Sequence, residues 1–343
     1  MGEAIPLETA TEIVRYDPDT LERYPTPAPV SKFTQCSDGR FFFGDNDRDE
    51  SSGKIIEYRP GEDASANTVL HLPGVMVFDM VCTAEGTLLL ATGNGTYVWT
   101  IGGETPTLLS RGADHVQNGF VTGVDQGRSG RTAFIDVSRN RWRQTRNRDN
   151  GYLDQLENRP WGTLYVQNRP NRRTRILNAD LVLPSDIALS ADERYAYVTE
   201  PNRATVKRVL LTGPHAGRSE IVTDAIPGQP VGIGFLPDGR LVVLLYEGRN
   251  PVQEQIYASP LLAHTLAKLR SVYRLYFHSD RSSLLVLDPE TGAFDEWHAL
   301  DTDAPVYLSS FIVDETGDIW INRGYPAELL RLPLSQRPAH SSE

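Results

Sequence analysis

One pattern of hydrophobic and polar positions recurs along the chain: an apolar run, a tight polar turn and a second apolar run. The clearest copy extends from Phe33 to Phe43 and turns at Asp38-Gly39. Asp-Gly between two apolar runs is a strong signal for a β-hairpin. The pattern predicts six such hairpins, whose second turn residues are at positions 39, 86, 130, 193, 239 and 317.

The spacing of these hairpins predicts the fold class. Three of the five intervals between them are 44 to 47 residues long, the length of a four-stranded propeller blade. After the last hairpin, the one further strand pattern is residues 329–332. Residues 12–24, near the start, form a hairpin pattern that none of the six hairpins includes. We therefore predict an all-β fold: residues 1–343 form a single six-bladed β-propeller, closed by strands from both termini.

The two longer intervals carry insertions. The first, residues 139–157, is polar and arginine-rich and is expected between blades 3 and 4. The second, at about 251–280 in blade 5, contains Leu261, Leu262 and Leu266 at helical spacing. It is expected to form a helix that packs on the rim, closes over a pocket as a lid, or anchors the protein to a membrane surface. The anchor is the weakest of the three, because basic residues are few there.

Charge and composition limit the classes of partner and the cellular location that we expect. The net charge is −11, so binding to a phosphate backbone would work against the overall field and no nucleic-acid partner is expected. No apolar stretch approaches 18 residues and no signal peptide is evident, so we expect no stable membrane insertion and a cytoplasmic location. Cys36 and Cys82 are too few for a disulfide framework or a cysteine-built zinc site, and both are expected to be buried apolar residues.

Candidate chemistry lies where the innermost strands begin, because these positions meet at one mouth of a propeller channel. The residues seven or eight positions before each second turn residue include Lys32, Phe78, Asp79, Thr122, Asp186, Val231 and Ser310. The loops on the same face add Asp45, Asp47, His115, Glu200 and Tyr246. This mouth would bring carboxylates, an imidazole and an ammonium within reach of one ligand.

We assign acid/base roles to three of these residues: Asp79, Asp186 and Glu200. The predicted substrate contacts are Lys32, Phe78, His115, Thr122, Val231, Tyr246 and Ser310. Structural alternatives stay open: Asp45 and Asp47 can cap strand ends, and Asp186 and Glu200 can bond to each other within blade 4.

Residues 183–200 and their continuation 207–222 resemble the fourth blade of strictosidine synthase-like proteins, and residues 134–138 resemble the third. The stretch from Arg249 to Leu269 is similar to the helical insert of the adipocyte plasma membrane-associated branch. The resemblance implies a six-bladed propeller of the group that includes gluconolactonases and paraoxonase-like esterases.

In those hydrolases, calcium is held by acidic and amide side chains at the starts of the innermost strands. The matching positions here are Ser31, Thr122, Ser185 and Val231, so we expect no metal and no cofactor. Strictosidine synthase itself uses a glutamate where this chain has Ser310. A hydroxyl cannot replace a carboxylate as a base, so that particular condensation is not expected.

These observations favour a metal-independent, strictosidine synthase-like enzyme of specialised, natural-product biosynthesis. Its substrate would be a small organic molecule at the channel mouth, and its reaction a cyclase, lyase or isomerase-type step by acid/base chemistry. Two alternatives remain. One is a calcium-dependent lactonase or esterase with rearranged ligands such as Asp45, Asp79 and Asp186. The other is a non-catalytic propeller that binds a ligand or a protein.

Overall fold

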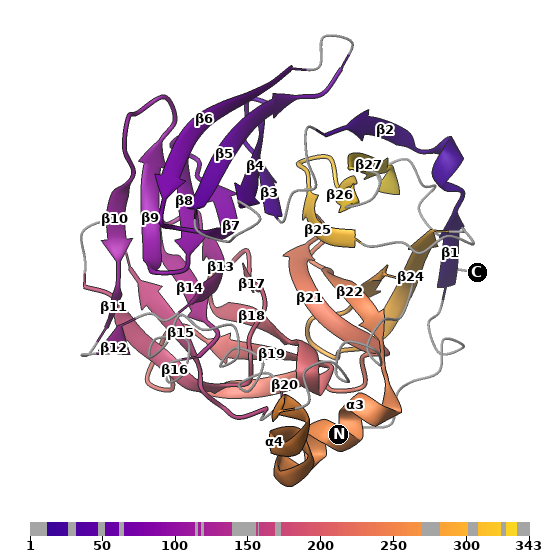
Figure 1. The fold of residues 1–343 in the computed structure, drawn as a ribbon. Helices are drawn as coiled ribbons and strands as arrows, with labels where there is room; N and C mark the ends of the chain where they lie inside the picture. The colour runs from indigo at the N-terminus through magenta and orange to yellow at the C-terminus, as the bar shows by residue number, and fades with distance from the viewer. Residues whose placement is uncertain are drawn as a thin grey trace.

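Six β-sheets are arranged around a central axis in the computed structural model (Figure 1). The structure describes residues 12–26, 32–46, 52–61, 65–113, 116–117, 120–138, 156, 158–168, 173–268, 282–300, 308–323 and 327–334. The predicted six-bladed β-propeller is confirmed.

Blades 1 to 3 each consist of four antiparallel strands. Blade 1 contains β3 (Lys32–Gln35), β4 (Phe41–Asn46), β5 (Ser52–Arg59) and β6 (Ser65–Pro73). Blade 2 contains β7 (Val77–Cys82), β8 (Thr87–Thr92), β9 (Gly95–Thr100) and β10 (Thr107–Ser110). A short ribbon of β11 (Gly112–Ala113) and β12 (Val116–Gln117) precedes blade 3. Blade 3 contains β13 (Val121–Gln126), β14 (Thr132–Asp136), β15 (Gly162–Gln167) and β16 (Arg175–Leu181).

Blades 4 to 6 repeat this plan with additions from the N-terminus. Blade 4 contains β17 (Ile187–Leu189), β18 (Tyr195–Glu200), β19 (Thr205–Leu210) and β20 (Ser219–Thr223). Blade 5 contains β21 (Gly228–Phe235), β22 (Leu241–Gly248), β23 (Ser283–Leu287), β24 (Phe294–Leu300) and β1 (Glu12–Tyr16). Blade 6 contains β25 (Leu308–Val313), β26 (Ile319–Arg323), β27 (Glu328–Leu332) and β2 (Glu22–Pro25).

The two ends of the chain close the ring, as predicted, but in a different way. The N-terminal segment does not form a hairpin: β2 pairs antiparallel with β27, while β1 pairs parallel with β24 in the neighbouring blade. The short 3₁₀ turn Pro18–Thr20 lies between them. Each inner strand contacts the next, and β25 contacts β3. The N-terminus therefore ties blade 5 to blade 6.

The hydrophobic core is divided among the blade interfaces. In the described residues, one buried cluster lies between each pair of adjacent blades. Phe41 and Phe43 pack toward blade 6, and Phe42 between them packs toward blade 2. Because successive side chains of a strand point to opposite faces, a blade covered on both faces needs continuous apolar runs.

The six inner hairpin turns share one backbone requirement. Their second residue has a positive φ, from 72° to 93° at the five glycines and 53° at Glu193. Glu193 adopts this conformation, which L side chains rarely do, while its carboxylate accepts a hydrogen bond from the Ser129 amide (2.7 Å). The turn residues thus account for the regular hairpins, and Glu193 also ties blade 4 to blade 3.

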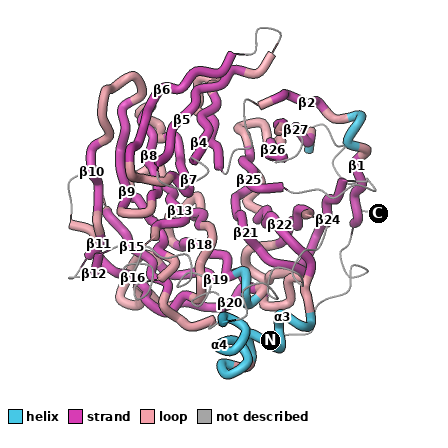
Figure 2. The backbone as a smooth tube through the Cα atoms, viewed as in Figure 1, coloured by secondary structure: helices cyan, strands magenta, loops and turns pink. Residues whose placement is uncertain are grey.

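Both insertions connect the second and third strands of a blade. Residues 139–157 therefore lie within blade 3, between β14 and β15, rather than between blades 3 and 4 as expected; of these, only Leu156 is described. The blade 5 insertion forms two helices, α3 (Pro251–Ala258) and α4 (Pro260–Lys268), outside the sheets (Figure 2). Residues 269–281 lie outside the described residues. No helix in the described ranges is long and apolar enough to cross a membrane.

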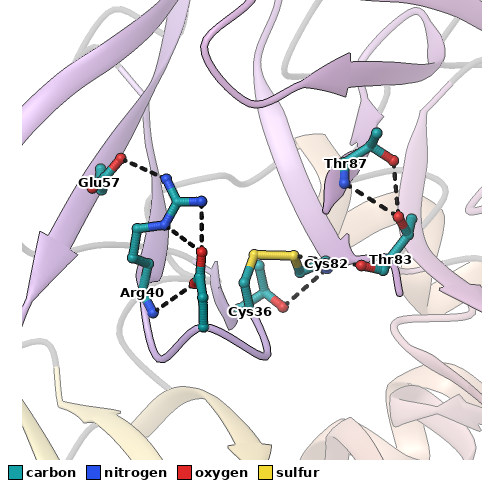
Figure 3. The surroundings of a disulfide bond; sticks show 8 residues. Cys36, Arg40, Glu57, Cys82, Thr83 and Thr87 are labelled. Atoms are coloured by element: carbon teal, nitrogen blue, oxygen red, sulfur yellow. Dashed lines mark hydrogen bonds and ion pairs between the residues drawn. A yellow bond between two sulfur atoms is a disulfide. The ribbon is translucent and has the colours of Figure 1, made fainter. Parts of the chain in front are cut away.

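The prediction that Cys36 and Cys82 are separate apolar residues is wrong. They form a disulfide between the end of β3 and the end of β7, so it joins blades 1 and 2 (Figure 3). The Cys82 amide also donates a hydrogen bond to the Thr34 hydroxyl (3.3 Å). Cys36 is three and Cys82 four positions before the second turn residues of consecutive blades, and the bond joins residues 46 positions apart in the sequence.

We expect the double variant Cys36→Ala, Cys82→Ala to be less stable by about 2–4 kcal/mol, because the crosslink restricts the unfolded chain. Urea midpoints of variant and wild type, each with and without dithiothreitol, would measure this. Reductant should lower the wild-type midpoint and leave that of the variant unchanged. Equal midpoints for oxidised wild type and variant would contradict the stabilising role.

Candidate functional site

Three charged side chains from three blades meet on the propeller axis. The Lys32 ammonium lies 3.0 Å from a carboxylate oxygen of Asp186 and 3.9 Å from one of Asp79. All three residues are seven positions before the second residue of an inner turn. The same position in the other blades is taken by Gly123, Gly232 and Ser310. We call these six residues the charged ring, and the face on which the inner strands begin the entry face.

A β-bulge precedes the charged ring in four inner strands. The strand register shifts at Phe78 in β7, Thr122 in β13, Val231 in β21 and Ser309 in β25. Bulges change the direction of side chains and are frequent beside functional sites. The side chains of the bulged residue and of the charged-ring residue after it therefore point in different directions.

The bulged residues connect neighbouring blades instead of entering the charged ring. The Thr122 hydroxyl donates to the carbonyl of Pro184 (3.0 Å), and the Val231 carbonyl accepts a hydrogen bond from Ser185 (3.1 Å). The Phe78 ring packs on Phe120, with centroids 3.9 Å apart. Of the predicted substrate contacts, Phe78 is thus placed beside an aromatic neighbour, while Thr122 and Val231 take part in bonds between blades.

Both ring carboxylates are anchored by the backbone of the next blade. Asp79 accepts a hydrogen bond from the Val124 amide (2.9 Å), which links blade 2 to blade 3. Asp186 accepts one from the Ile233 amide (3.2 Å), which links blade 4 to blade 5. Each donor amide belongs to the residue directly after a glycine of the charged ring, Gly123 or Gly232. A Cβ at either glycine would come within 3.3 Å of side chains between the blades, Ile135 and Ile187 at Gly123 and Leu244 and Phe311 at Gly232, so the close packing of adjacent blades favours glycine there.

Burial and charge set the protonation of this cluster. Burial raises the pKa of Asp79, the Lys32 ammonium opposes this and Asp186 adds to it, with the result that the pKa is about 7. Burial lowers the pKa of Lys32, but the Asp186 and Asp79 carboxylates outweigh it and the pKa is raised overall. Near neutral pH, Lys32 is therefore a cation and Asp79 exchanges its proton readily.

The three charged side chains are only slightly exposed to solvent. The exposed fractions of the side chains are 16% for Lys32, 10% for Asp79 and 12% for Asp186. All three side chains are therefore nearly buried. Ser310, on the same ring, is 2% exposed, and its hydroxyl has no hydrogen-bond partner among the described residues. It is a buried polar group at the same strand position as the three charged residues.

Glu200 is not part of this cluster. Its side chain is fully buried, and one carboxylate oxygen accepts hydrogen bonds from the Val182 amide (2.7 Å) and from Lys207 (2.9 Å). This places it beside β19 in a structural ion pair. The alternative of a direct bond between Asp186 and Glu200 is also not what the structure shows. Glu200 is better explained by the packing of blade 4 than by acid/base chemistry.

The remaining predicted residues lie elsewhere or cannot be placed. The Tyr246 carbonyl accepts a hydrogen bond from Ser282 (2.9 Å) beside blade 6. Asp45 pairs with Lys54 (2.9 Å) on the adjacent strand of blade 1. His115 and Asp47 lie outside the described residues.

The helical insertion borders the entry face. The side-chain oxygen Oε1 of Gln253 in α3 accepts a hydrogen bond from the Gln229 side chain at the start of β21 (2.8 Å). Leu156, from the blade 3 insertion, packs with Ile256 and Ala263 of the two helices. The insertions of blades 3 and 5 therefore contact each other on the side of blade 4, which lies between those two blades. This packing supports the predicted rim helix.

The donor set of the charged ring does not fit a calcium ion. Calcium takes six to eight oxygen ligands, whereas the ring supplies two carboxylates and one hydroxyl around an ammonium. One oxygen of each carboxylate already accepts a backbone hydrogen bond. Lys32 supplies the positive charge that these carboxylates require.

Comparison with known proteins agrees with this architecture. Two Arabidopsis thaliana proteins named STRICTOSIDINE SYNTHASE-LIKE 13 and 7 are 29% and 27% identical to the chain over 154 and 242 residues. The adipocyte plasma membrane-associated protein of Salmo salar is 26% identical over 228 residues. The chain resembles strictosidine synthase-like propellers. The predicted resemblance is confirmed, although no family model matches the chain.

The strictosidine synthase-like resemblance covers only part of each protein. The matches include 45%, 70% and 61% of this chain and 35%, 62% and 54% of the three relatives. Among solved structures, a gluconolactonase from Xanthomonas campestris is similar with a TM-score of 0.61 at 13% identity, covering 90% of this chain and 87% of that one. Regucalcin, a calcium-binding protein from Agrobacterium tumefaciens, gives 0.59 at 10% identity, covering 94% and 95%. These two likenesses show the fold alone.

The ionisation of Asp79 predicts a pH dependence of stability. An acid with a raised pKa binds its proton more tightly in the folded state, so its contribution to the free energy of unfolding decreases as pH rises from about 4 to about 7. Wild type should lose stability relative to Asp79→Asn over this range. Urea titrations between pH 4.5 and 8 would measure the difference, with Asp180→Asn, an exposed acid on β16, as control. A difference that does not vary with pH would contradict the assigned pKa.

Proposed function

We propose that the protein is a metal-independent enzyme that acts on a small, partly apolar organic molecule at the entry face of the channel. The observation that supports this most directly is the buried Lys32–Asp79–Asp186 cluster, in which Asp79 has a pKa of about 7. A general acid or base works best when its pKa lies near the working pH. Perturbed carboxylates at a channel mouth are also typical of functional sites.

The four ring residues with polar side chains each have a role in this proposal. Ionised Asp79 takes a proton from the substrate and returns it to the product, so no net proton is consumed. The Lys32 ammonium stabilises negative charge that develops on the substrate. Asp186 holds Lys32 in place (3.0 Å), and the unpartnered Ser310 hydroxyl orients the substrate. Glu200 is left out, because it is engaged with Lys207.

Proton transfer without a metal suits a ring-forming, lyase or isomerase-type step. The similarity to strictosidine synthase-like proteins supports an enzyme of this propeller group, and the placement in natural-product biosynthesis is part of our proposal. A calcium-dependent lactonase is less well supported: its fold is shared with the gluconolactonase, but the donor set of the charged ring does not suit calcium.

One observation favours a second candidate, a propeller that binds a ligand without catalysis. Both ring carboxylates accept backbone hydrogen bonds from the next blade, so the fold alone gives a reason for their presence. Asparagine keeps an oxygen acceptor of the same size and removes the ionisation. This substitution therefore separates the two candidates.

The cytoplasmic location stays a prediction, and the disulfide weighs against it. Structural disulfides persist in oxidising compartments and are rare in the cytosol. The Cys36–Cys82 bond therefore favours an oxidising compartment. The absence of a nucleic-acid partner likewise stays a prediction from charge.

We expect Asp79→Asn to reduce turnover about 10²- to 10⁴-fold, which is typical for loss of a general acid or base. In the wild type, activity should increase with pH through about 7, as Asp79 ionises. Asp186→Asn should reduce turnover by releasing Lys32, while Asp180→Asn should have no effect. Wild-type turnover in both ring variants would show that these carboxylates are structural, as in the non-catalytic alternative.

Removal of metal gives a separate test. Because Lys32 already pairs with both ring carboxylates, exhaustive EDTA treatment should change neither the melting temperature nor turnover. A melting temperature that falls by several degrees and is restored by calcium would support the lactonase alternative, since a bound ligand stabilises the folded state.

A further inference from the structure

A cavity of about 500 Å³ lies at the other end of the channel, on the face of the inner hairpin turns. Its wall includes one residue from each blade, two positions beyond the charged ring. These residues are Thr34, Val81, Asp125, Ala188, Gly234 and Ile312. Side chains two apart in a strand point the same way, at about 3.3 Å per residue. The cavity therefore lies about 7 Å below the charged ring, on the same axis.

All charges on the described cavity wall are negative. The acidic lining residues are Asp125, Asp314 and Glu315, and no lysine, arginine or histidine is among the residues that line it. Asp314 is engaged in its own turn, where it accepts hydrogen bonds from Thr316 (2.6 Å) and Trp320 (2.9 Å). Glu315 is exposed at the rim. Asp125 is thus the acid that faces the interior.

Asp125 is held rigidly, yet its carboxylate keeps acceptor capacity. One oxygen accepts a hydrogen bond from the Gln126 amide (2.7 Å), and the other accepts one from Leu189 in the next blade (2.7 Å). A carboxylate oxygen can accept two. One position on each oxygen therefore remains for a ligand, and the backbone bonds fix the direction in which it is offered.

The rest of the wall combines apolar side chains with the polar residues Thr34, Gln35, Ser37 and Thr316. Ile233, Phe235, Phe311 and Val313 contribute apolar side chains. On the blade 1 and blade 2 side, the wall includes Cys36 and Cys82, which form the disulfide shown in Figure 3. The volume is within the range of small-molecule sites, and a rigid wall reduces the entropic cost of binding.

We propose that this cavity binds a small organic cation, an apolar body carrying one protonated amine, with Asp125 as its counter-ion. This site is distinct from the proposed acid/base site at the entry face, and its assignment does not rest on that proposed function. Its ligand is selected by charge at one point and by apolar contact elsewhere. A neutral analogue would leave Asp125 without a charged partner, and an anion would be repelled.

Binding of such a cation depends on the protonation of Asp125. Burial raises the pKa of Asp125 to about 6; hydrogen bonds from Leu189 and Gln126 oppose this, and the charges of Asp186 and Glu193 add to it. Only the ionised carboxylate pairs with a cation. Affinity should therefore increase as pH rises through about 6, whereas binding at Asp79 would change near 7.

The test uses three probes of one shape: benzylammonium, benzyl alcohol and benzoate. Dissociation constants would be measured by NMR titration of the intact wild-type protein at low salt. We expect benzylammonium to bind about 10- to 100-fold more tightly than benzyl alcohol, the value of a charged hydrogen bond. Benzoate should bind most weakly. Equal affinities for the cation and the alcohol, or no binding by any probe at millimolar concentration, would overturn the proposal.

Single substitutions would show where benzylammonium binds. Asp125→Asn should reduce benzylammonium affinity about 10-fold or more, and Glu315→Gln, at the exposed rim, should change it little. Asp79→Asn should retain binding. Loss of binding in Asp79→Asn with retention in Asp125→Asn would place the probe at the entry face and overturn the assignment. If Asp125→Asn does not fold, the amide shifts of the wild-type titration decide: changes at Leu189 and Phe235, which line the cavity, support the assignment, and changes confined to Ser310 of the charged ring, or none, exclude it.

Discussion

The Lys32 ammonium lies between two carboxylates that are each bonded to the backbone of the next blade, and the centre of the ring depends on this arrangement. The hydrophobic clusters lie between the blades, so they leave the axis to short polar strand ends. A buried charge is tolerated when it is paired and hydrogen-bonded. Lys32 supplies the pairing, and the amides of Val124 and Ile233 supply hydrogen bonds.

The same contacts explain why Asp79 is both structural and reactive. Its hydrogen bond to blade 3 fixes where the carboxylate points, and burial raises its pKa despite the nearby ammonium. Without Lys32, two carboxylates would remain without a cation near the axis and their protons would be held more tightly. The lysine therefore keeps the proton of Asp79 exchangeable near neutral pH, a function that a second neutral residue could not perform.

The sequence predicted what depends on local repetition. The turn residues placed six hairpins in register, and counting seven positions back from each turn brought together Lys32, Asp79 and Asp186. The same counting places Cys36 three and Cys82 four positions before the second turn residues of consecutive blades, which could have indicated that the two cysteines lie close enough to bond. It could also have found Asp125, two positions beyond the ring in blade 3.

Side-chain direction at strand ends was harder to predict. Glu200 ends the second strand of blade 4 on the entry face, but its side chain points into the blade toward Lys207, which only the register of β18 and β19 reveals. Thr122 and Val231 were displaced from the axis by bulges, which shift the register by one residue. The N-terminal pattern resembled a hairpin because both strands alternate, yet each pairs with a different blade.

Asp186 connects the two ends of the channel electrostatically. Its negative charge raises the pKa of Asp79 in the charged ring and that of Asp125 in the cavity. The two acids therefore experience a common field, although they face opposite mouths. A cation beside Asp125 would reduce that field, favour the ionised form of Asp79 and lower its pKa. By reciprocity, ionisation of Asp79 would strengthen binding of the cation. The propeller axis thus provides a short physical route by which occupancy of the cavity can adjust the basicity of the entry face, without any movement of the blades.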